Sequence, residues 1–133
     1  MNKLSLTCIG IAVMGAAGSL ARFGVAQALG LMTAYPAGTL VVNVAGAFAL
    51  GWVNVVFSGR AGAQGLGGGY GDVWRLVLGV GLLGGFTTFS SMMFDADKMM
   101  TDAQYLRTAL YLGASLFLGL VAVRAGVIVG KGM

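Results

Sequence analysis

The chain has 133 residues, of which 58% are hydrophobic and only 9% are charged. Soluble domains carry about 25% charged residues, so this composition excludes a soluble protein and predicts a single membrane domain. Histidine and glutamate are absent and the basic residues that give a net charge of +4 mostly flank apolar runs, which argues against an enzyme and against a nucleic-acid partner.

Four apolar segments are each long enough to cross a bilayer, which takes about 20 residues. The predicted fold is therefore an all-α membrane protein, residues 1–133, with four transmembrane helices at 4–29, 38–57, 74–94 and 105–129. Glycine-rich residues 58–72 are predicted as a flexible loop. Lys3 followed by an apolar run is also typical of a secretory signal peptide. Removal of the first segment by a signal peptidase is therefore an alternative.

Polar residues are expected near the ends of these segments. Asp72 is predicted to be the N-cap of the third helix, and Asp95 is predicted to mark its end. Arg124, close to the end of the fourth helix, is expected to extend toward the interface. Cys8 is the single cysteine, which excludes an intrachain disulfide, and we expect it to be a buried, inert thiol.

Small residues at helical spacing predict close contacts between helices. Gly79–Gly84 matches the nucleotide-binding pattern G-x-G-x-x-G, but no β-α-β unit surrounds it, so we interpret it as another packing face. The other small residues are Gly15, Gly18 and Ala21 in the first helix, Ala45, Gly46 and Ala49 in the second, and Gly119, Ala122, Gly126 and Gly130 in the fourth.

The third segment is the least regular of the four. Gly84 and Gly85 are flexible, and Thr87 and Thr88 are β-branched, so we expect this helix to be broken at its middle. Unpaired backbone groups are tolerated in a membrane only inside protein or beside a watery cavity. Transport proteins hold ions at such unwound carbonyls, and the sequence therefore predicts an ion site here.

The membrane segments contain neutral hydrogen-bond donors but no carboxylate at mid-depth. Neutral donors suit a desolvated anion, whereas the missing carboxylate disfavours a small multidrug antiporter. Dehydrating a carboxylate-sized ion costs about 20 kcal/mol in the idealised case, and one donor returns about 1.5–3 kcal/mol, so conduction needs a row of donors. Alternatively, the hydroxyls bond their own helix backbone. The donors are Asn43, Thr87, Thr88, Ser90, Ser91 and Ser115.

Four motifs resemble those of the Fluc (CrcB) fluoride channels, and together they extend along nearly the whole chain. They are Gly18-Ser19-Leu20-Ala21-Arg22-Phe23, Gly38-Thr39-Leu40-Val41-Val42-Asn43, Gly84-Gly85-Phe86-Thr87-Thr88-Phe89-Ser90 and Tyr111-Leu112-Gly113-Ala114-Ser115. The resemblance implies a passive channel that exports fluoride across the inner membrane of a microbe. It also implies a dimer of antiparallel copies enclosing two pores. The basic residues on the two sides of the membrane only weakly favour cytoplasmic termini, and this near balance permits insertion in both orientations.

The resemblance also implies roles for individual residues. A structural sodium ion at the dimer centre would be held by the backbone carbonyls of Gly84 and Thr87. Arg22 would draw anions into the channel mouth, although by residue chemistry alone it would extend to the interface. The implied anion pathway comprises Arg22, Asn43, Thr88, Phe89, Met92, Asp95, Tyr111 and Ser115.

Some positions depart from the family pattern. Met92 stands in place of a second pore phenylalanine, and Asp95 stands in place of a glutamate. Gly119 and Val123 replace hydroxyl-bearing residues, which shortens the row of donors. Two alternatives to a homodimeric channel are therefore a non-conducting assembly subunit and a heterodimer with a paralogous subunit.

Overall fold

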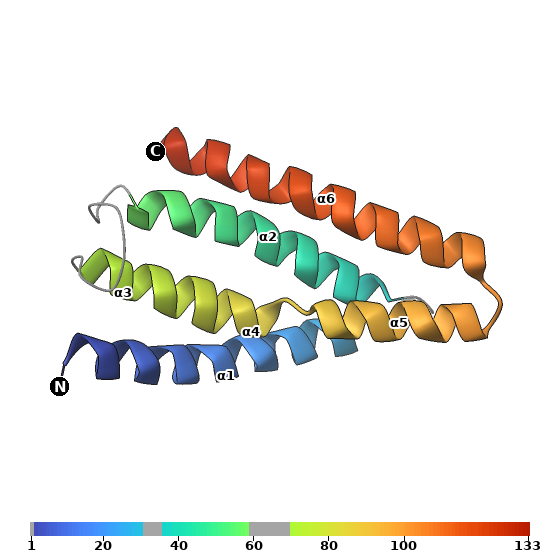
Figure 1. The fold of residues 1–133 in the computed structure, drawn as a ribbon, viewed down its shortest axis with the longest axis horizontal. Coiled ribbons are helices and arrows are strands. Elements are labelled where there is room, and N and C mark those ends of the chain that lie inside the picture. Colours follow the sequence, from blue (N-terminus) through green and yellow to red (C-terminus); the bar gives the residue numbers. More distant parts are fainter. Residues whose placement is uncertain (1, 31–35, 59–69) are drawn as a thin grey trace.

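The computed structural model describes residues 2–30, 36–58 and 70–133, which form a bundle of helices (Figure 1). Among these residues, four helical stretches are long and apolar enough to cross a membrane: Lys3–Gly30, Ala37–Phe57, Gly71–Thr101 and Tyr105–Lys131. The prediction of four membrane-length helices is therefore confirmed. The two termini lie at one end of the bundle and the α5–α6 connection lies at the other (Figure 1).

Three of the long stretches are single helices and the third is composite. The single helices are α1 (Lys3–Gly30), α2 (Ala37–Ser58) and α6 (Tyr105–Lys131). The third stretch consists of α3 (Tyr70–Leu76), a π-helix η1 (Val77–Leu83), α4 (Gly84–Phe86) and α5 (Phe89–Thr101). Between α4 and α5, Thr87 (φ −82°, ψ 157°) and Thr88 (φ −153°, ψ 115°) are extended. We call these two residues the α4–α5 junction.

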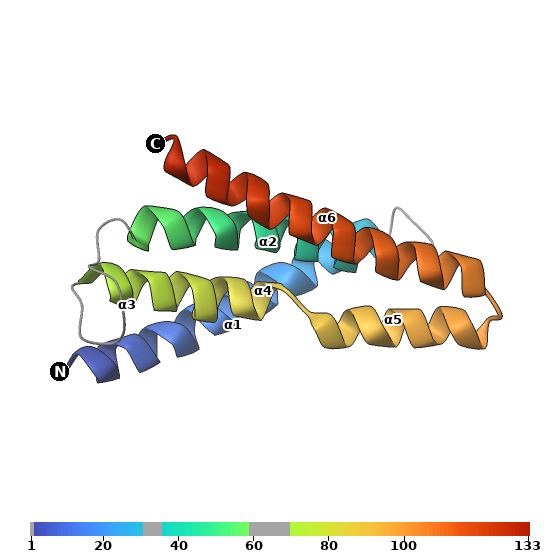
Figure 2. The ribbon, with the colours of Figure 1, turned by 45° about the horizontal axis from the view of Figure 1, so that its top comes forward.

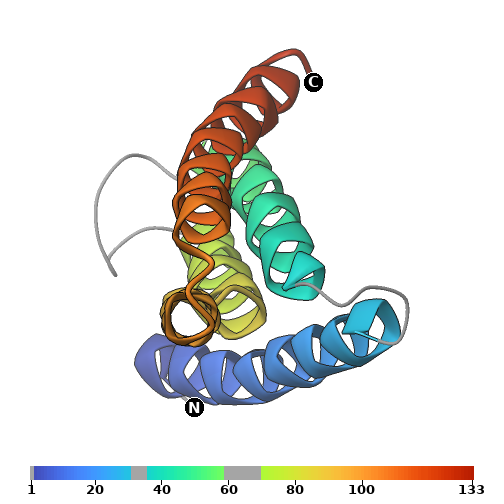
Figure 3. The same ribbon diagram turned by 90° about the vertical axis from the view of Figure 1, so that its right-hand side faces the viewer.

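Helix α6 packs along α2, whereas α1 is inclined to the other helices (Figures 2 and 3). Glycines bring α2 and α6 together: a Cβ on Gly126 of α6 would collide with the Phe48 carbonyl, and one on Gly51 of α2 would collide with the Val123 carbonyl. Only a residue without a side chain allows two backbones to approach this closely. These contacts confirm the predicted packing role of Gly126.

Glycines also hold α1 against η1 and α4. A Cβ on Gly18 would collide with the Leu82 carbonyl, and one on Gly81 would lie 3.0 Å from the Cα of Ile11. The interpretation of the G-x-G-x-x-G segment as a packing face is thus confirmed at Gly81. At Gly119 an added Cβ would have no neighbour within 4 Å among the described residues, so Gly119 makes no close helix contact within the single chain.

The end of the third stretch differs from the prediction. Helix α5 continues past Phe94 and Asp95 to Thr101, because buried residues recur along it at Met92, Ala96 and Met99. A charge at Asp95 therefore does not end the helix, because Ala96, one residue on, and Met99, four residues on, are buried.

Two further predictions were wrong. Asp72 is not an N-cap, because α3 begins at Tyr70 and places Asp72, which is buried, within its first turn. Cys8 is exposed on α1. Most of the predicted loop 58–72 lies outside the described residues, and Ser58 is the last residue of α2.

Candidate ion site at the α4–α5 junction

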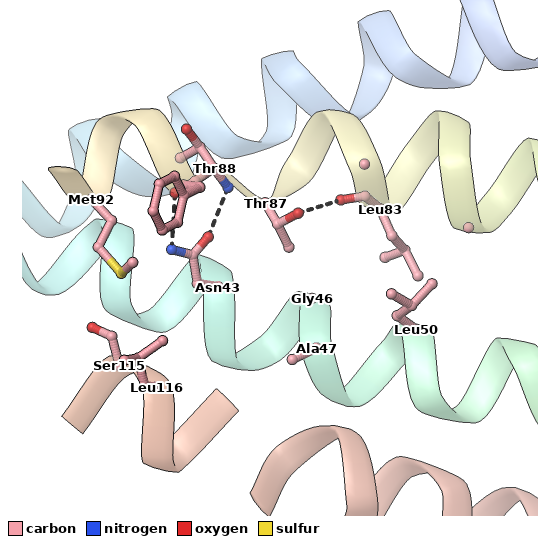
Figure 4. A pocket seen from close by; sticks show the side chains of 13 residues that line it. Asn43, Gly46, Ala47, Leu50, Leu83, Thr87, Thr88, Met92, Ser115 and Leu116 are labelled. Carbon is pink, nitrogen blue, oxygen red and sulfur yellow. Dashed lines mark hydrogen bonds between the residues drawn. The ribbon is translucent and has the colours of Figure 1, made fainter. Parts of the chain in front are cut away.

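The side-chain amide of Asn43 on α2 binds the backbone of Thr88 at two points. The Thr88 N–H donates to Asn43 Oδ1 at 2.7 Å, and Asn43 Nδ2 donates to the Thr88 carbonyl at 3.1 Å (Figure 4). Asn43 is half-buried in an apolar segment, where its amide oxygen and nitrogen both need partners, and the extended backbone at Thr88 presents its N–H and C=O to this one side chain. Asn43 therefore stabilises the non-helical conformation of the junction.

This arrangement diverts two backbone amides from their helical partners. In a continuous α-helix the Thr88 N–H would donate to the Gly84 carbonyl, and the Ser91 N–H would donate to the Thr87 carbonyl. Here the Thr88 N–H donates to Asn43, and the Ser91 N–H donates to Thr88 Oγ1 at 3.1 Å as an N-cap of α5. The carbonyls of Gly84 and Thr87 thus lose the helical partners they would otherwise have.

Helix α1 supplies hydrogen-bond donors to the backbone carbonyl of Gly85, the residue after Gly84. Arg22 Nε donates to the Gly85 carbonyl at 3.2 Å, and Ser19 Oγ donates to the same oxygen at 3.5 Å. Arg22 is half-buried and its guanidinium binds the protein, so it does not extend simply to the interface as residue chemistry alone suggested.

Seven of the predicted site residues line one open cavity of about 330 Å³ (Figure 4). Met92 of α5 and Ser115 of α6 point into it from opposite sides (Figure 4). Met92 is buried, whereas Phe89 is 69% exposed in the single chain and so presents most of its ring outside the protomer. The seven are Asn43, Gly84, Thr87, Thr88, Phe89, Met92 and Ser115, and the other lining residues are Gly46, Ala47, Leu50, Gly79, Leu83 and Leu116.

Most hydroxyls around this cavity already have partners in the chain. Thr87 Oγ1 donates to the Leu83 carbonyl at 3.0 Å, and Ser115 Oγ donates to the Tyr111 carbonyl at 2.7 Å. Backbone bonding is thus confirmed for these two. The hydroxyls of Ser90 and Ser91 instead lie 3.2 Å and 3.0 Å from Thr88 Oγ1. These hydroxyls could donate to an anion in the cavity only by giving up their present hydrogen bonds within the chain.

Asp95, Tyr111 and Arg22, the remaining predicted site residues, do not line this cavity. Asp95 and Tyr111 meet beyond it: Asp95 Oδ2 accepts a hydrogen bond from Thr39 Oγ1 at 2.7 Å and another from Tyr111 Oη at 3.4 Å. Thr39 was not singled out from the sequence. Thr39 lies four residues before Asn43, which places both on the same side of α2, and this spacing could have identified Thr39 from the sequence.

Comparison with known proteins gives one consistent family. The family model described as CrcB-like protein, Camphor Resistance (CrcB), matches residues 9–127. A protein named Fluoride-specific ion channel FluC from Caulobacter vibrioides (strain NA1000 / CB15N) is 38% identical over 133 residues, covering 98% of this chain and 97% of its own length. One of the same name from Roseiflexus sp. (strain RS-1) is 38% identical over 132 residues, covering 96% of each chain.

A more distant relative, Fluoride-specific ion channel FluC 1 of Geobacillus kaustophilus (strain HTA426), is 33% identical over 122 residues, which cover 91% of this chain and 95% of that protein. Similarity at this level therefore extends across all four membrane-length helices, as expected of a multi-pass membrane protein. The chain belongs to the CrcB family.

Proposed function

We propose that this chain is a passive, fluoride-selective channel in the cell inner membrane that lets accumulated fluoride leave the cytoplasm. Its full-length similarity to proteins named fluoride-specific ion channels supports this function over that of an enzyme. The observation that carries the proposal is the α4–α5 junction, where the backbone is extended within a membrane-length apolar stretch and borders a cavity.

The functional unit is a dimer of two antiparallel copies, with the third membrane helix broken at its middle. Gly84 is exposed in the single chain and its carbonyl has lost its helical partner. An unpaired carbonyl facing lipid costs several kcal/mol, so a second copy removes that penalty if it covers this surface and brings a cation or a donor to the oxygen. A paralogous subunit with the same junction would serve equally well.

A structural sodium ion at the dimer centre is held by the carbonyls of Gly84 and Thr87. These are neutral oxygen ligands without helical partners, and backbone carbonyls are the groups that replace the hydration shell of monovalent cations in channels. The donor set therefore fits such a cation, and the bound charge would hold two copies together at a point where each lacks hydrogen bonds.

Fluoride passes through the cavity beside the junction. Asn43, Phe89, Met92 and Ser115 line it, and the electropositive edge of an aromatic ring can face an anion. The Thr88 hydroxyl adds a polar group at the cavity wall, while Tyr111 and Asp95 lie about one helical turn beyond Ser115 and Met92. No single donor repays the dehydration of a small anion, so several must act in sequence.

A second candidate is a subunit that conducts only when paired with a paralogue. Three relatives carry the numbered names FluC 1, FluC 2 and FluC 3, and Met92 lacks the aromatic edge expected at its position. In this case the purified chain would assemble without conducting.

Fluoride efflux from liposomes tests the proposal directly. The purified full chain is reconstituted into liposomes loaded with potassium fluoride, and external fluoride is followed with an ion-selective electrode after valinomycin is added. We expect rapid efflux of fluoride and none of chloride, with protein-free liposomes as the control. Absence of fluoride efflux would exclude the homodimeric channel and favour the subunit that needs a paralogue.

A further inference from the structure

One side of α1 is shaped to fit the backbone of α4. Gly15, Gly18, Ser19 and Arg22 recur at the spacing that places residues on a single helix face. A Cβ on Gly85 would collide with the Gly15 carbonyl, and one on Gly18 would lie 3.0 Å from the Phe86 nitrogen. The absence of a side chain at Gly18 of α1 and at Gly85 of α4 therefore allows backbone contact, and Ser19 and Arg22 of the same α1 face lie beside the Gly85 carbonyl.

The Gly85 carbonyl uses both of its acceptor positions on α1. Arg22 Nε donates to it at 3.2 Å, and Ser19 Oγ donates at 3.5 Å. A carbonyl oxygen has two lone pairs, so a cation at this oxygen would have to compete with the Arg22 donor and with the longer bond from Ser19. The carbonyl of Gly84, by contrast, lacks its helical donor, because the Thr88 N–H donates to Asn43 instead.

We propose that Arg22 is a positioning residue for the cation site, because its bond to the Gly85 carbonyl fixes this peptide against α1. The carbonyls of Gly84 and Thr87, rather than that of Gly85, are thereby left to face the cation. This inference rests on the proposed function, in which those two carbonyls bind sodium, and it gives Arg22 a task beyond attracting anions by its charge.

Substitution by lysine separates the two tasks. Lysine keeps the positive charge but lacks the planar guanidinium and its Nε–H donor. If Arg22 serves only to attract anions, Arg22→Lys behaves as the wild type. If Arg22 positions the Gly85 peptide, Arg22→Lys weakens the cation site while the attraction of anions persists. Arg124, which is exposed on α6, offers a matched control in Arg124→Lys.

The first measurement is the sodium dependence of fluoride efflux. Wild type, Arg22→Lys and Arg124→Lys are dialysed free of sodium and assayed in liposomes at increasing sodium concentration, with N-methylglucamine as the replacement cation. We expect half-maximal efflux of Arg22→Lys to need at least severalfold more sodium than the wild type, and Arg124→Lys to match the wild type. Identical sodium dependence of Arg22→Lys and the wild type would overturn the inference.

The second measurement does not depend on conduction. Amide hydrogen exchange of residues 84–91 is followed by mass spectrometry in lipid nanodiscs, without sodium, for the same three proteins. We expect severalfold faster exchange in Arg22→Lys alone, because the peptide at Gly85 has lost its guanidinium donor. Unchanged exchange would overturn the positioning role. If the wild type fails to conduct fluoride, the proposed function fails, and this exchange experiment still decides the role of Arg22.

Discussion

Asn43 and Thr88 form a two-point contact in which one side-chain amide satisfies both backbone groups of a residue 45 positions away. Because the Thr88 N–H donates to Asn43, it does not donate to the Gly84 carbonyl as it would in a continuous helix. The residue that supports the extended backbone is thus also the residue that frees a carbonyl. Asn43 therefore links the conformation of the third membrane stretch to its capacity to bind an ion.

Replacing Asn43 tests both its support of the extended backbone and its contact with an anion. Asn43→Ala leaves the Thr88 N–H and C=O without these partners, and we expect a loss of about 1–3 kcal/mol in folding free energy together with loss of fluoride efflux. Asn43→Asp keeps an acceptor for the Thr88 N–H but sets a second oxygen against the Thr88 carbonyl and adds a charge within the membrane, so we expect lost efflux and a loss of stability at least as large. Efflux from liposomes and thermal unfolding in detergent measure the two effects. Unchanged efflux in Asn43→Ala would remove Asn43 from the pathway.

Restoring a hydroxyl to α6 should speed conduction. Gly119 stands where the family pattern has a hydroxyl-bearing residue, and an added Cβ there would meet nothing within 4 Å among the described residues. We expect Gly119→Ser to raise the fluoride efflux rate severalfold, because it lengthens the row of donors. Gly113→Ser, at another position with an unobstructed Cβ on the same helix, is the control and should leave the rate unchanged. Equal rates for Gly119→Ser and the wild type would show that the row does not include this position.

The hydrogen bond between Thr39 and Asp95 should couple α2 to α5. Thr39→Val keeps the side-chain shape but removes the donor to Asp95 Oδ2, which lies 2.7 Å away. We expect a destabilisation of about 1.5 kcal/mol, the low end for a charged hydrogen bond, since the pair is only partly buried. A double-mutant cycle with Asp95→Asn measures the coupling. Thr101→Val, which alters an exposed threonine bonded to its own helix, should change stability by less than about 0.5 kcal/mol. Additive effects of Thr39→Val and Asp95→Asn would contradict the coupling.

Close packing of α6 on α2 should depend on Gly126. In Gly126→Ala the new Cβ would collide with the Phe48 carbonyl, a backbone atom that cannot rotate away. We expect a loss of about 1–3 kcal/mol in folding free energy, measured by thermal unfolding. Gly113→Ala is the control, and it should be neutral or stabilising by up to about 1 kcal/mol, because alanine favours the helix. Equal stability of the two variants would show that α2 and α6 separate easily at this point.

The sequence predicts the four membrane-length helices well, because a helix that can cross a membrane is recognised from the number of consecutive apolar residues alone. It is less informative about where a helix ends at charged residues. Asp95 looked like a boundary, yet Ala96 and Met99 are buried and carry α5 onward to Thr101. A helix can present a charge on one side while it buries the other, and the choice of side depends on neighbours that are distant in the sequence.

The sequence also singled out several residues that line the cavity at the junction, but not the partners that they bind. Asn43 stood out as an amide in an uncharged apolar segment, and Gly84 and Thr87 stood out by their backbone preferences. That Asn43 binds Thr88, or that Arg22 binds the Gly85 carbonyl, follows from the approach of helices through glycine contacts. Such contacts pair residues far apart in the chain, so inspection of local sequence does not identify them.

A density map of the protein in lipid nanodiscs containing sodium would decide whether the third membrane stretch opens around a cation. We expect two antiparallel copies in which α-helix stops at Phe86 and resumes at Phe89. We also expect density on the two-fold axis between the Gly84 and Thr87 carbonyls of both copies. A third membrane stretch that is continuously α-helical through Thr87 and Thr88, with no density at the two-fold centre, would contradict this expectation.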